Sequence, residues 1–187
     1  SIPNVVVTAP KDGNELLDLL NLGIKEKLIL SIRYPKLNTL YTSSRTPKMI
    51  ELGTWEILTE GIDVCILTFG SMIENSLHSA NEINKKYNKN LVTVVNCRFI
   101  KPLDESLLEK LLLRYKKIIV VEEGILSGGF GSSVLEFKSK LNCNSLIKIH
   151  AIDDSFTTHG DRKSLLELCK LDVNSITKSI DNFINEK

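Results

Sequence analysis

Residues 91–121 read LVTVVNCRFIKPLDESLLEKLLLRYKKIIVV, and this stretch decides the fold class. An apolar run at 91–97 is followed by leucines at helical spacing and then by a β-branched run at 118–121. The leucines are Leu107, Leu108, Leu111 and Leu112. A strand, a helix and a second strand in this order form a unit whose strands are usually parallel. We therefore expect an α/β fold.

The same alternation extends to both sides of this stretch. The further expected elements are a strand at 64–69, a helix at 73–87, a helix at 130–141, a strand at 146–152, a short helix at 165–169 and a closing helix at 176–183. Such alternation predicts a mostly parallel sheet with helices on both faces. A short strand at 55–58, joined to the strand at 64–69 by a turn at Glu60-Gly61, is expected to form a hairpin at the edge of this sheet.

The first 53 residues are expected to form a separate unit. Strand patterns at 5–9 and 28–34 flank a helix that Asp12 would cap, with Glu15 as its capping-box partner. This predicts a β-α-β remnant, and two parallel strands alone cannot cover both faces of a sheet. We therefore expect the chain to begin inside a domain. Polar residues accumulate at 36–53, which predicts a linker and a division into domains at 1–53 and 54–187.

Composition excludes several classes of function. The chain has 187 residues, 42% of them hydrophobic, with a formal net charge of +1, so it offers no field that would gather nucleic acid. No apolar run reaches the roughly 18 residues that a membrane helix needs, so no membrane partner is expected. The four cysteines lie far apart in the sequence and are expected to be buried, reduced thiols.

A glycine-rich stretch at 124–133 follows a strand and opens a helix, where dinucleotide-binding folds hold phosphates. Its spacing does not fit, because Val134 stands where the third glycine of G-x-G-x-x-G belongs. Glycines for a tight turn and for close packing of helix against sheet are the favoured interpretation. Anion binding by the free amides of the helix is the alternative.

Several acidic and histidine side chains are candidates for catalytic or metal-binding groups. Glu122 and Glu123 end a strand, where hydrogen bonding between domains or solvation is favoured over an acid–base pair. Asp153, Asp154 and His159 lack a second histidine at ligand spacing, so no metal site is expected. His150, within a strand, is expected to be a hydrogen-bonded structural histidine.

The segment Arg33-Tyr34-Pro35-Lys36 is the most suggestive chemically. Two cations three residues apart across a proline turn can converge on one phosphate, Arg33 through two parallel hydrogen bonds and Lys36 as a point charge. The alternative is a surface arginine that pairs with an acidic neighbour.

Motifs along nearly the whole chain resemble the deoxyxylulose-5-phosphate synthase family. They are IPNVVVTAP at 2–10, RYP at 33–35, LTFGSM at 67–72, RFIKPLD at 98–104, EEG at 122–124 with GGFGS at 128–132, and DSF at 154–156 with HG at 159–160. The proline-aspartate and glutamate-glycine segments are shared with transketolases and with the beta subunits of pyruvate-dehydrogenase-type enzymes. The Arg-Tyr-Pro segment and the Phe-Thr-Thr-His-Gly loop favour the synthase.

The resemblance implies that residues 1 to about 50 end a pyrimidine-binding domain and that the rest is a transketolase C-terminal domain. Enzymes of the family condense pyruvate with glyceraldehyde 3-phosphate on thiamine diphosphate and magnesium, as homodimers, for isoprenoid precursors and thiamine. The cofactor-binding and catalytic segments of the family would precede Ser1. We therefore expect this chain alone to be inactive and to carry no catalytic, cofactor-binding or metal-binding residue.

The resemblance also assigns the substrate phosphate to Arg33 and Lys36, which match the family's Arg-Tyr-Pro-Arg-Gly segment. Here Lys36 replaces the second arginine and Leu37 the glycine, so one bidentate contact becomes a point charge. The compartment implied is a plastid-type organelle (apicoplast or chloroplast) in a eukaryote and the cytoplasm in a bacterium. The alternatives are the tail of a transketolase or of a pyruvate-dehydrogenase-type beta subunit, or a self-standing regulatory α/β ligand-binding module.

Overall fold

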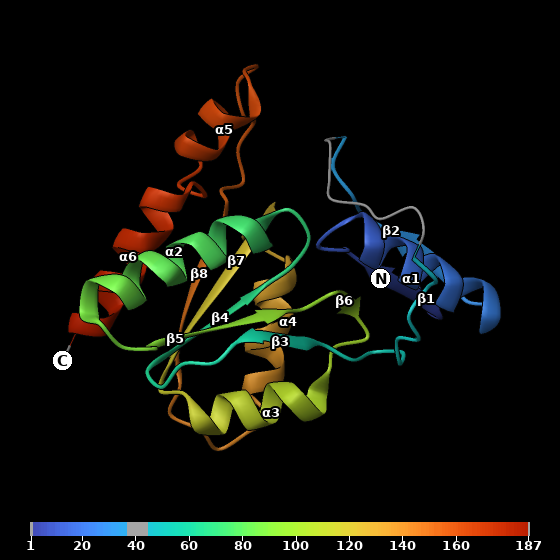
Figure 1. Ribbon diagram of the computed structural model, residues 1–187, viewed down its shortest axis with the longest axis horizontal. Helices are drawn as coiled ribbons and strands as arrows, with labels where there is room; N and C mark the ends of the chain where they lie inside the picture. Colours follow the sequence, from blue (N-terminus) through green and yellow to red (C-terminus); the bar gives the residue numbers. More distant parts are fainter. Residues whose placement is uncertain (1, 37–44, 187) are drawn as a thin grey trace.

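The computed structural model describes residues 2–36 and 45–186, which contain two β-sheets lying side by side (Figure 1). The predicted linker at 36–53 falls in part on residues 37–44, and these, with Leu37 among them, lie outside the described residues. No helix in the described part of the chain is long and apolar enough to cross a membrane.

The larger sheet has five strands in the order β3-β5-β4-β7-β8. Their bounds are Glu56–Thr59 (β3), Val64–Thr68 (β4), Val92–Asn96 (β5), Lys117–Ile125 (β7) and Leu146–Ile152 (β8). Neighbouring strands from β5 to β8 pair in parallel, and β3 pairs with β5 in antiparallel orientation. The predicted, mostly parallel α/β sheet is confirmed.

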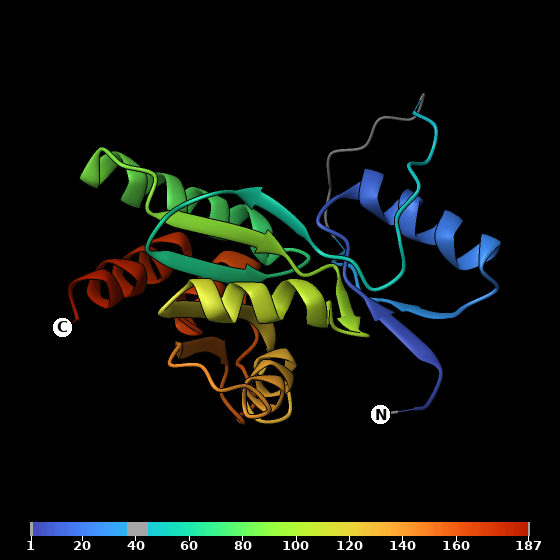
Figure 2. The same cartoon turned by 90° about the horizontal axis from the view of Figure 1, so that it is seen from below.

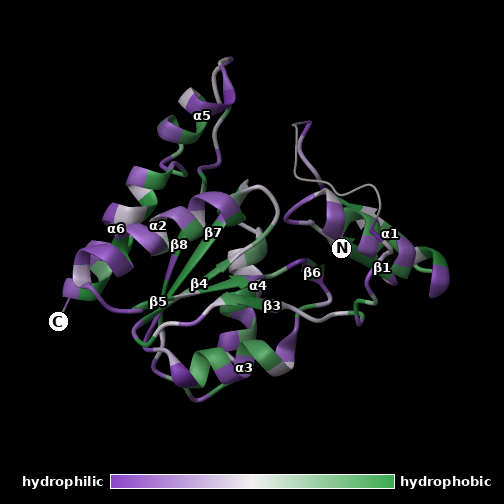
Figure 3. Cartoon of the chain, in the orientation of Figure 1, coloured by the Kyte–Doolittle hydropathy of each residue, from purple (hydrophilic) through white to green (hydrophobic). Residues whose placement is uncertain are grey.

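Helices cover both faces of this sheet (Figure 1). The covering helices are Met72–Tyr87 (α2), Glu105–Arg114 (α3), Phe130–Lys138 (α4) and Val173–Asn185 (α6), and a further short helix, Arg162–Leu168 (α5), precedes α6. α2 and α6 pack on the face that carries Ile66 and Ile119, while α3 and α4 pack on the face that carries Leu67 and Val120. β4 and β7 are accordingly hydrophobic along most of their length (Figure 3).

The predicted hairpin between the first two strands of this sheet is wrong. β3 and β4 do not pair, because β5 lies between them. All five residues of β4 are buried, so this strand needs parallel neighbours on both edges and helices on both faces. β3 has partly exposed positions and takes the edge beyond β5.

The smaller sheet has the order β2-β1-β6, with strands Val5–Thr8 (β1), Ile29–Ile32 (β2) and Phe99–Lys101 (β6). β1 and β2 are parallel and joined by helix α1, Gly13–Lys25, as predicted. The third strand, β6, was not predicted. β6 lies between β5 and α3 in the sequence and pairs antiparallel with β1. It thereby connects the smaller unit, formed by β1, β2 and α1, to the larger unit, formed by the five-stranded sheet and its helices (Figure 2).

The start of α1 follows the prediction with one difference. Asp12 caps the helix, since its Oδ1 accepts a hydrogen bond from the Glu15 amide at 2.8 Å. A capping box would return a bond from Glu15 to the Asp12 amide. Glu15 instead accepts from the amide of Lys11 at 2.7 Å, one residue earlier, and its other carboxylate oxygen accepts from Asn96 in the larger unit at 2.8 Å.

Candidate functional site

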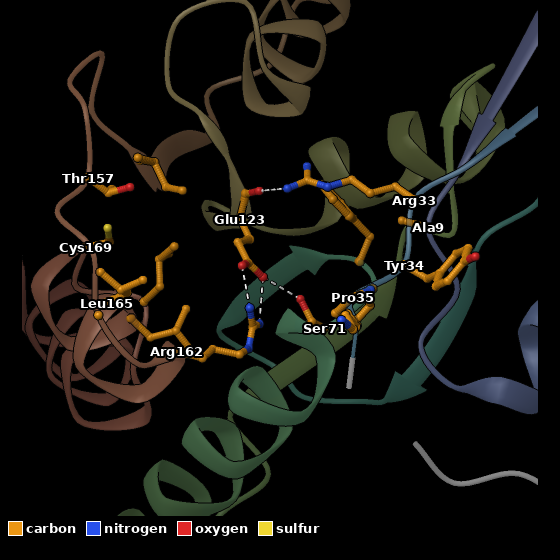
Figure 4. A pocket seen from close by; sticks show the side chains of 17 residues that line it. Ala9, Arg33, Tyr34, Pro35, Ser71, Glu123, Thr157, Arg162, Leu165 and Cys169 are labelled. Atoms are coloured by element: carbon orange, nitrogen blue, oxygen red, sulfur yellow. Dashed lines mark hydrogen bonds and ion pairs between the residues drawn. The ribbon is translucent and has the colours of Figure 1, made fainter. Parts of the chain in front are cut away.

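A cleft of about 540 Å³ opens where the end of β2 meets the ends of β4 and β7 (Figure 4). The polar or charged side chains that line it from the larger unit include those of Ser71, Glu123 and Arg162. The segment 33–36 lines it from the smaller unit. The carboxyl ends of parallel strands are the usual place for a site in an open α/β sheet. A second cleft of about 800 Å³ shares part of this lining and continues along the start of α1.

The structure brings Arg33 and Lys36 to this one cleft. The Arg33 guanidinium donates a hydrogen bond to the backbone carbonyl oxygen of Glu123, which is 90 residues away in the sequence. Arg33 therefore contacts the peptide group of an acidic residue and not its carboxylate. Lys36 is exposed, and no acidic side chain among residues 2–36 and 45–186 pairs with it.

Glu123 lies at the centre of the polar contacts in the cleft (Figure 4). Its carboxylate accepts two hydrogen bonds from Arg162, at 2.5 and 2.7 Å, and one from the Ser71 hydroxyl at 2.6 Å. Burial opposes ionisation, but the bonds from Arg162 and Ser71 outweigh it and lower the pKa of this carboxyl. At this position, hydrogen bonding between the units within the described residues is found only at the backbone carbonyl of Glu123, which accepts the bond from Arg33, whereas the Glu123 carboxylate bonds within its own unit.

Glu122 points to the opposite side of β7 and is only 2% exposed. Its carboxylate accepts hydrogen bonds from the backbone amides of Phe130 and Gly131, at 2.9 and 2.8 Å, in the first turn of α4. Burial raises the pKa of Glu122 despite these bonds. The amides that were the alternative anion site are therefore occupied by the protein's own carboxylate.

The glycine-rich stretch has the favoured, structural role. Gly128 has a φ of +77°, which an L side chain rarely adopts, so it forms the tight turn. A Cβ atom on Gly131 would lie 2.7 Å from Cδ1 of Ile149, so this glycine lets α4 approach β8 closely. Both parts of the prediction are confirmed.

The histidine and aspartate candidates lie away from the polar centre of the cleft. His150 Nε2 is 2.7 Å from the Ser179 hydroxyl, which confirms a hydrogen-bonded structural histidine, and burial lowers its pKa. Asp153, Asp154 and His159 are all exposed. Within the described residues, no group of three or more His, Cys, Asp or Glu side chains is placed to hold a metal ion.

Sequence reasoning missed two members of this cleft, Ser71 and Arg162. Ser71 lies in the quoted LTFGSM motif, just before α2, so its place after a buried strand was a usable signal. Arg162 lies 39 residues after its partner Glu123 in a polar segment without periodicity, and no pattern in the sequence points to it.

Residues 53–176 match the family model described as "Transketolase, C-terminal domain". Among curated proteins, the chain is 39% identical over 179 residues to the 1-deoxy-D-xylulose-5-phosphate synthase of Aquifex aeolicus, covering 96% of this chain and 28% of the relative. The enzyme of the same name from Bacillus licheniformis is 42% identical over 169 residues, covering 89% and 26%. The chain thus spans less than a third of the length of these relatives.

Solved structures share the fold. A split-gene transketolase, an inactive beta4 tetramer, superposes with a TM-score of 0.85 at 23% identity, covering 98% of this chain and 59% of the other. The transketolase of Campylobacter jejuni superposes with a TM-score of 0.62 at 21% identity, covering 96% and 26%.

Proposed function

Because the chain belongs to the transketolase C-terminal domain family, we propose that it forms the carboxyl-terminal part of a synthase that makes 1-deoxy-D-xylulose 5-phosphate. Relatives that bear this enzyme name are 34 to 42% identical to the chain, whereas the transketolase structures are only 21 and 23% identical. This difference favours the synthase over a transketolase tail.

The proposed reaction joins pyruvate to glyceraldehyde 3-phosphate. A carbon–carbon bond forms between the carbonyl carbon of pyruvate and the aldehyde carbon, the bond to the pyruvate carboxylate breaks, carbon dioxide leaves, and the aldehyde oxygen takes up a proton. Thiamine diphosphate with Mg²⁺, held by the rest of the protein, would supply the electron sink for the decarboxylation. The residues of this chain would act on the aldehyde substrate alone.

The observation that carries the proposal is the pair of cations at the end of β2. Arg33 and Lys36 line one cleft, and a phosphate ester needs cations and hydrogen-bond donors of this kind. The bond from Arg33 to the Glu123 carbonyl uses one edge of its guanidinium and leaves other N–H groups for a ligand. Arg33 and Lys36 are therefore the proposed phosphate-binding residues.

The complete enzyme is proposed to be a homodimer, in a plastid-type organelle if the source is a eukaryote and in the cytoplasm if it is a bacterium. The first test is an assay of the full-length protein with pyruvate, glyceraldehyde 3-phosphate, thiamine diphosphate and Mg²⁺. We expect release of carbon dioxide together with deoxyxylulose 5-phosphate. Absence of this product from a folded, cofactor-loaded protein would overturn the proposal.

Replacement of Arg33 by Ala in the full-length enzyme tests the phosphate site. A hydrogen bond to a charged group contributes roughly 1.5 to 3 kcal/mol, so we expect KM for glyceraldehyde 3-phosphate to rise about tenfold or more. Lys36→Ala should raise the same KM by a smaller factor. The measurement is steady-state kinetics with the phosphorylated aldehyde varied at saturating pyruvate.

Two controls make the Arg33 experiment specific. Unphosphorylated glyceraldehyde should show nearly the same KM with the variant and the parent enzyme, since it lacks the group that Arg33 would bind. Lys89→Ala removes an exposed lysine beyond the far end of α2 and should leave both constants unchanged. An unchanged KM for glyceraldehyde 3-phosphate in Arg33→Ala removes this residue from the site.

A further inference from the structure

The charged side chains that line the cleft include an ion pair in addition to the two predicted cations. Besides Arg33 and Lys36, the lining contains a third cation, Arg162, and one carboxylate, Glu123, which gives a net charge of +2. Arg162 comes from the first turn of α5, more than 120 residues after the other two cations.

The geometry ties Arg162 to the only carboxylate that lines the described cleft (Figure 4). The guanidinium meets both carboxylate oxygens of Glu123, at 2.5 and 2.7 Å, in the bidentate arrangement that only arginine provides. The two side chains are 31% and 27% exposed, so solvent screens the pair only in part. Without Arg162, this carboxylate would face the same cleft with Ser71 as its remaining side-chain partner.

Glu123 also contacts Arg33, because its carbonyl oxygen accepts the Arg33 hydrogen bond. An unpaired carboxylate on this residue would therefore lie one side chain away from the proposed phosphate contact. It would repel an incoming phosphate and attract the Arg33 guanidinium away from its ligand. Both effects would weaken the binding of a dianion more than the binding of a neutral molecule.

We propose that Arg162 is a specificity-determining residue of the cleft, which neutralises Glu123 and thereby keeps the lining positive for a phosphate ester. The inference rests on the proposed function, since it concerns the substrate of the same site. Arg162 of α5 neutralises the Glu123 carboxylate, whereas Arg33 at the end of β2 contacts only the carbonyl oxygen of Glu123.

A double-mutant cycle in the full-length enzyme tests this role. Arg162→Met removes the charge and keeps an unbranched side chain, and we expect KM for glyceraldehyde 3-phosphate to rise about tenfold, because a cation is lost and a carboxylate is unmasked. Glu123→Gln alone removes the carboxylate that Arg162 pairs with and completes the cycle. The double variant Arg162→Met/Glu123→Gln restores the net charge of the lining, and its KM should return to within about threefold of the parent value.

Unphosphorylated glyceraldehyde is the matched control substrate. Its KM should stay nearly constant across the cycle, and kcat should change little with either substrate. Equal increases for both aldehydes in Arg162→Met would show a merely structural role and overturn the inference. An unchanged KM in Arg162→Met, or a double variant that stays as poor as the single one, would overturn it as well.

A binding measurement gives a readout apart from turnover. Calorimetric titration of the full-length protein with glycerol 3-phosphate should show weaker binding in Arg162→Met and recovery in the double variant, with folding checked by circular dichroism. The Arg33→Ala variant separates the two proposals. If Arg33→Ala leaves phosphate affinity unchanged, the proposed site fails, whereas loss of affinity in Arg33→Ala without any loss in Arg162→Met refutes the role of Arg162 alone.

Discussion

The pKa values of two adjacent glutamates at the end of β7 are shifted in opposite directions from the same ordinary value. Successive side chains of a strand point to opposite faces, so Glu122 turns toward α4 and Glu123 toward the cleft. Burial dominates at Glu122 and raises its pKa, while Arg162 and Ser71 outweigh burial at Glu123 and lower its pKa. At the residue scale, the partner decides which carboxylate is easily ionised.

This difference predicts opposite pH dependences for two substitutions. The pKa of Glu123 in the folded chain lies below its ordinary value of 4.5, so its ionised form stabilises the fold above that pH, and the contribution is lost as the pH falls through the folded value. The free-energy advantage of the parent chain over Glu123→Gln should therefore shrink as the pH is lowered from about 7 to about 3.5.

Glu122→Gln is the matched comparison, because the folded pKa of Glu122 lies above the same value of 4.5. Its contribution is present at low pH and is lost as the pH rises through the folded pKa. The advantage of the parent chain over this variant should thus grow on acidification. Urea unfolding across the pH range measures both, and parallel curves for the two variants would contradict the assignment.

At the scale of single elements, the start of α4 depends on a glycine that has no room for a side chain. A Cβ atom on Gly129 would lie 2.2 Å from the Ile125 carbonyl oxygen and 2.7 Å from Oε2 of Glu122. The first contact involves backbone and the second a carboxylate already held by two amides. Neither neighbour can move without loss of the turn or of the bonds at the start of the helix.

Gly129→Ala should therefore destabilise the chain by about 3 kcal/mol through overpacking and loss of these hydrogen bonds. Gly160→Ala is the control, since a Cβ there would meet only Leu165 at an ordinary 3.5 Å, and its effect should stay within about 0.5 kcal/mol. Urea denaturation measures both variants. Equal stability of Gly129→Ala and the parent would show that the turn can rearrange.

The order of helices and strands could be predicted from the sequence because apolar runs and helical leucine spacing are local signals. Strand pairing could not. The pair formed by β3 and β5 joins segments about 40 residues apart, and the three-residue strand β6 before Pro102 has the length of a loop. Arg33 and Lys36 could be proposed as a site because they lie in one short motif. The Arg162–Glu123 pair could not be predicted, because it forms only when β7 and α5 come together in the fold.

At the scale of the whole molecule, a buried carboxylate joins the two units. Glu15 of α1 is 3% exposed and accepts hydrogen bonds from Asn96 at 2.8 Å and from Arg98 at 3.4 Å, both in the larger unit. Arg98 is held in turn by the Thr54 carbonyl at 2.8 Å. These contacts lie next to the β1–β6 pairing, so the polar network and the shared sheet support one another.

Glu15→Ala should destabilise the chain by about 3 kcal/mol, because it leaves the buried Asn96 amide without its acceptor and removes the carboxylate that pairs with Arg98. Hydrogen exchange should rise first in α1, β1 and β2, the unit that the network holds in place. Glu109→Ala, at an exposed position of α3, is the control and should change stability by no more than about 0.5 kcal/mol. Uniform exchange throughout the chain would contradict a local role.

The membership of β6 in the smaller sheet also sets an order of events on the ribosome. Synthesis proceeds from the amino terminus, so β1 and β2 leave the exit tunnel about 70 residues before Phe99–Lys101. Until then the nascent unit has one edge of β1 unpaired, and an unpaired edge invites pairing with other chains. Completion of the smaller sheet must wait for β6, which lies between β5 and α3 in the sequence, and this couples the two units during translation.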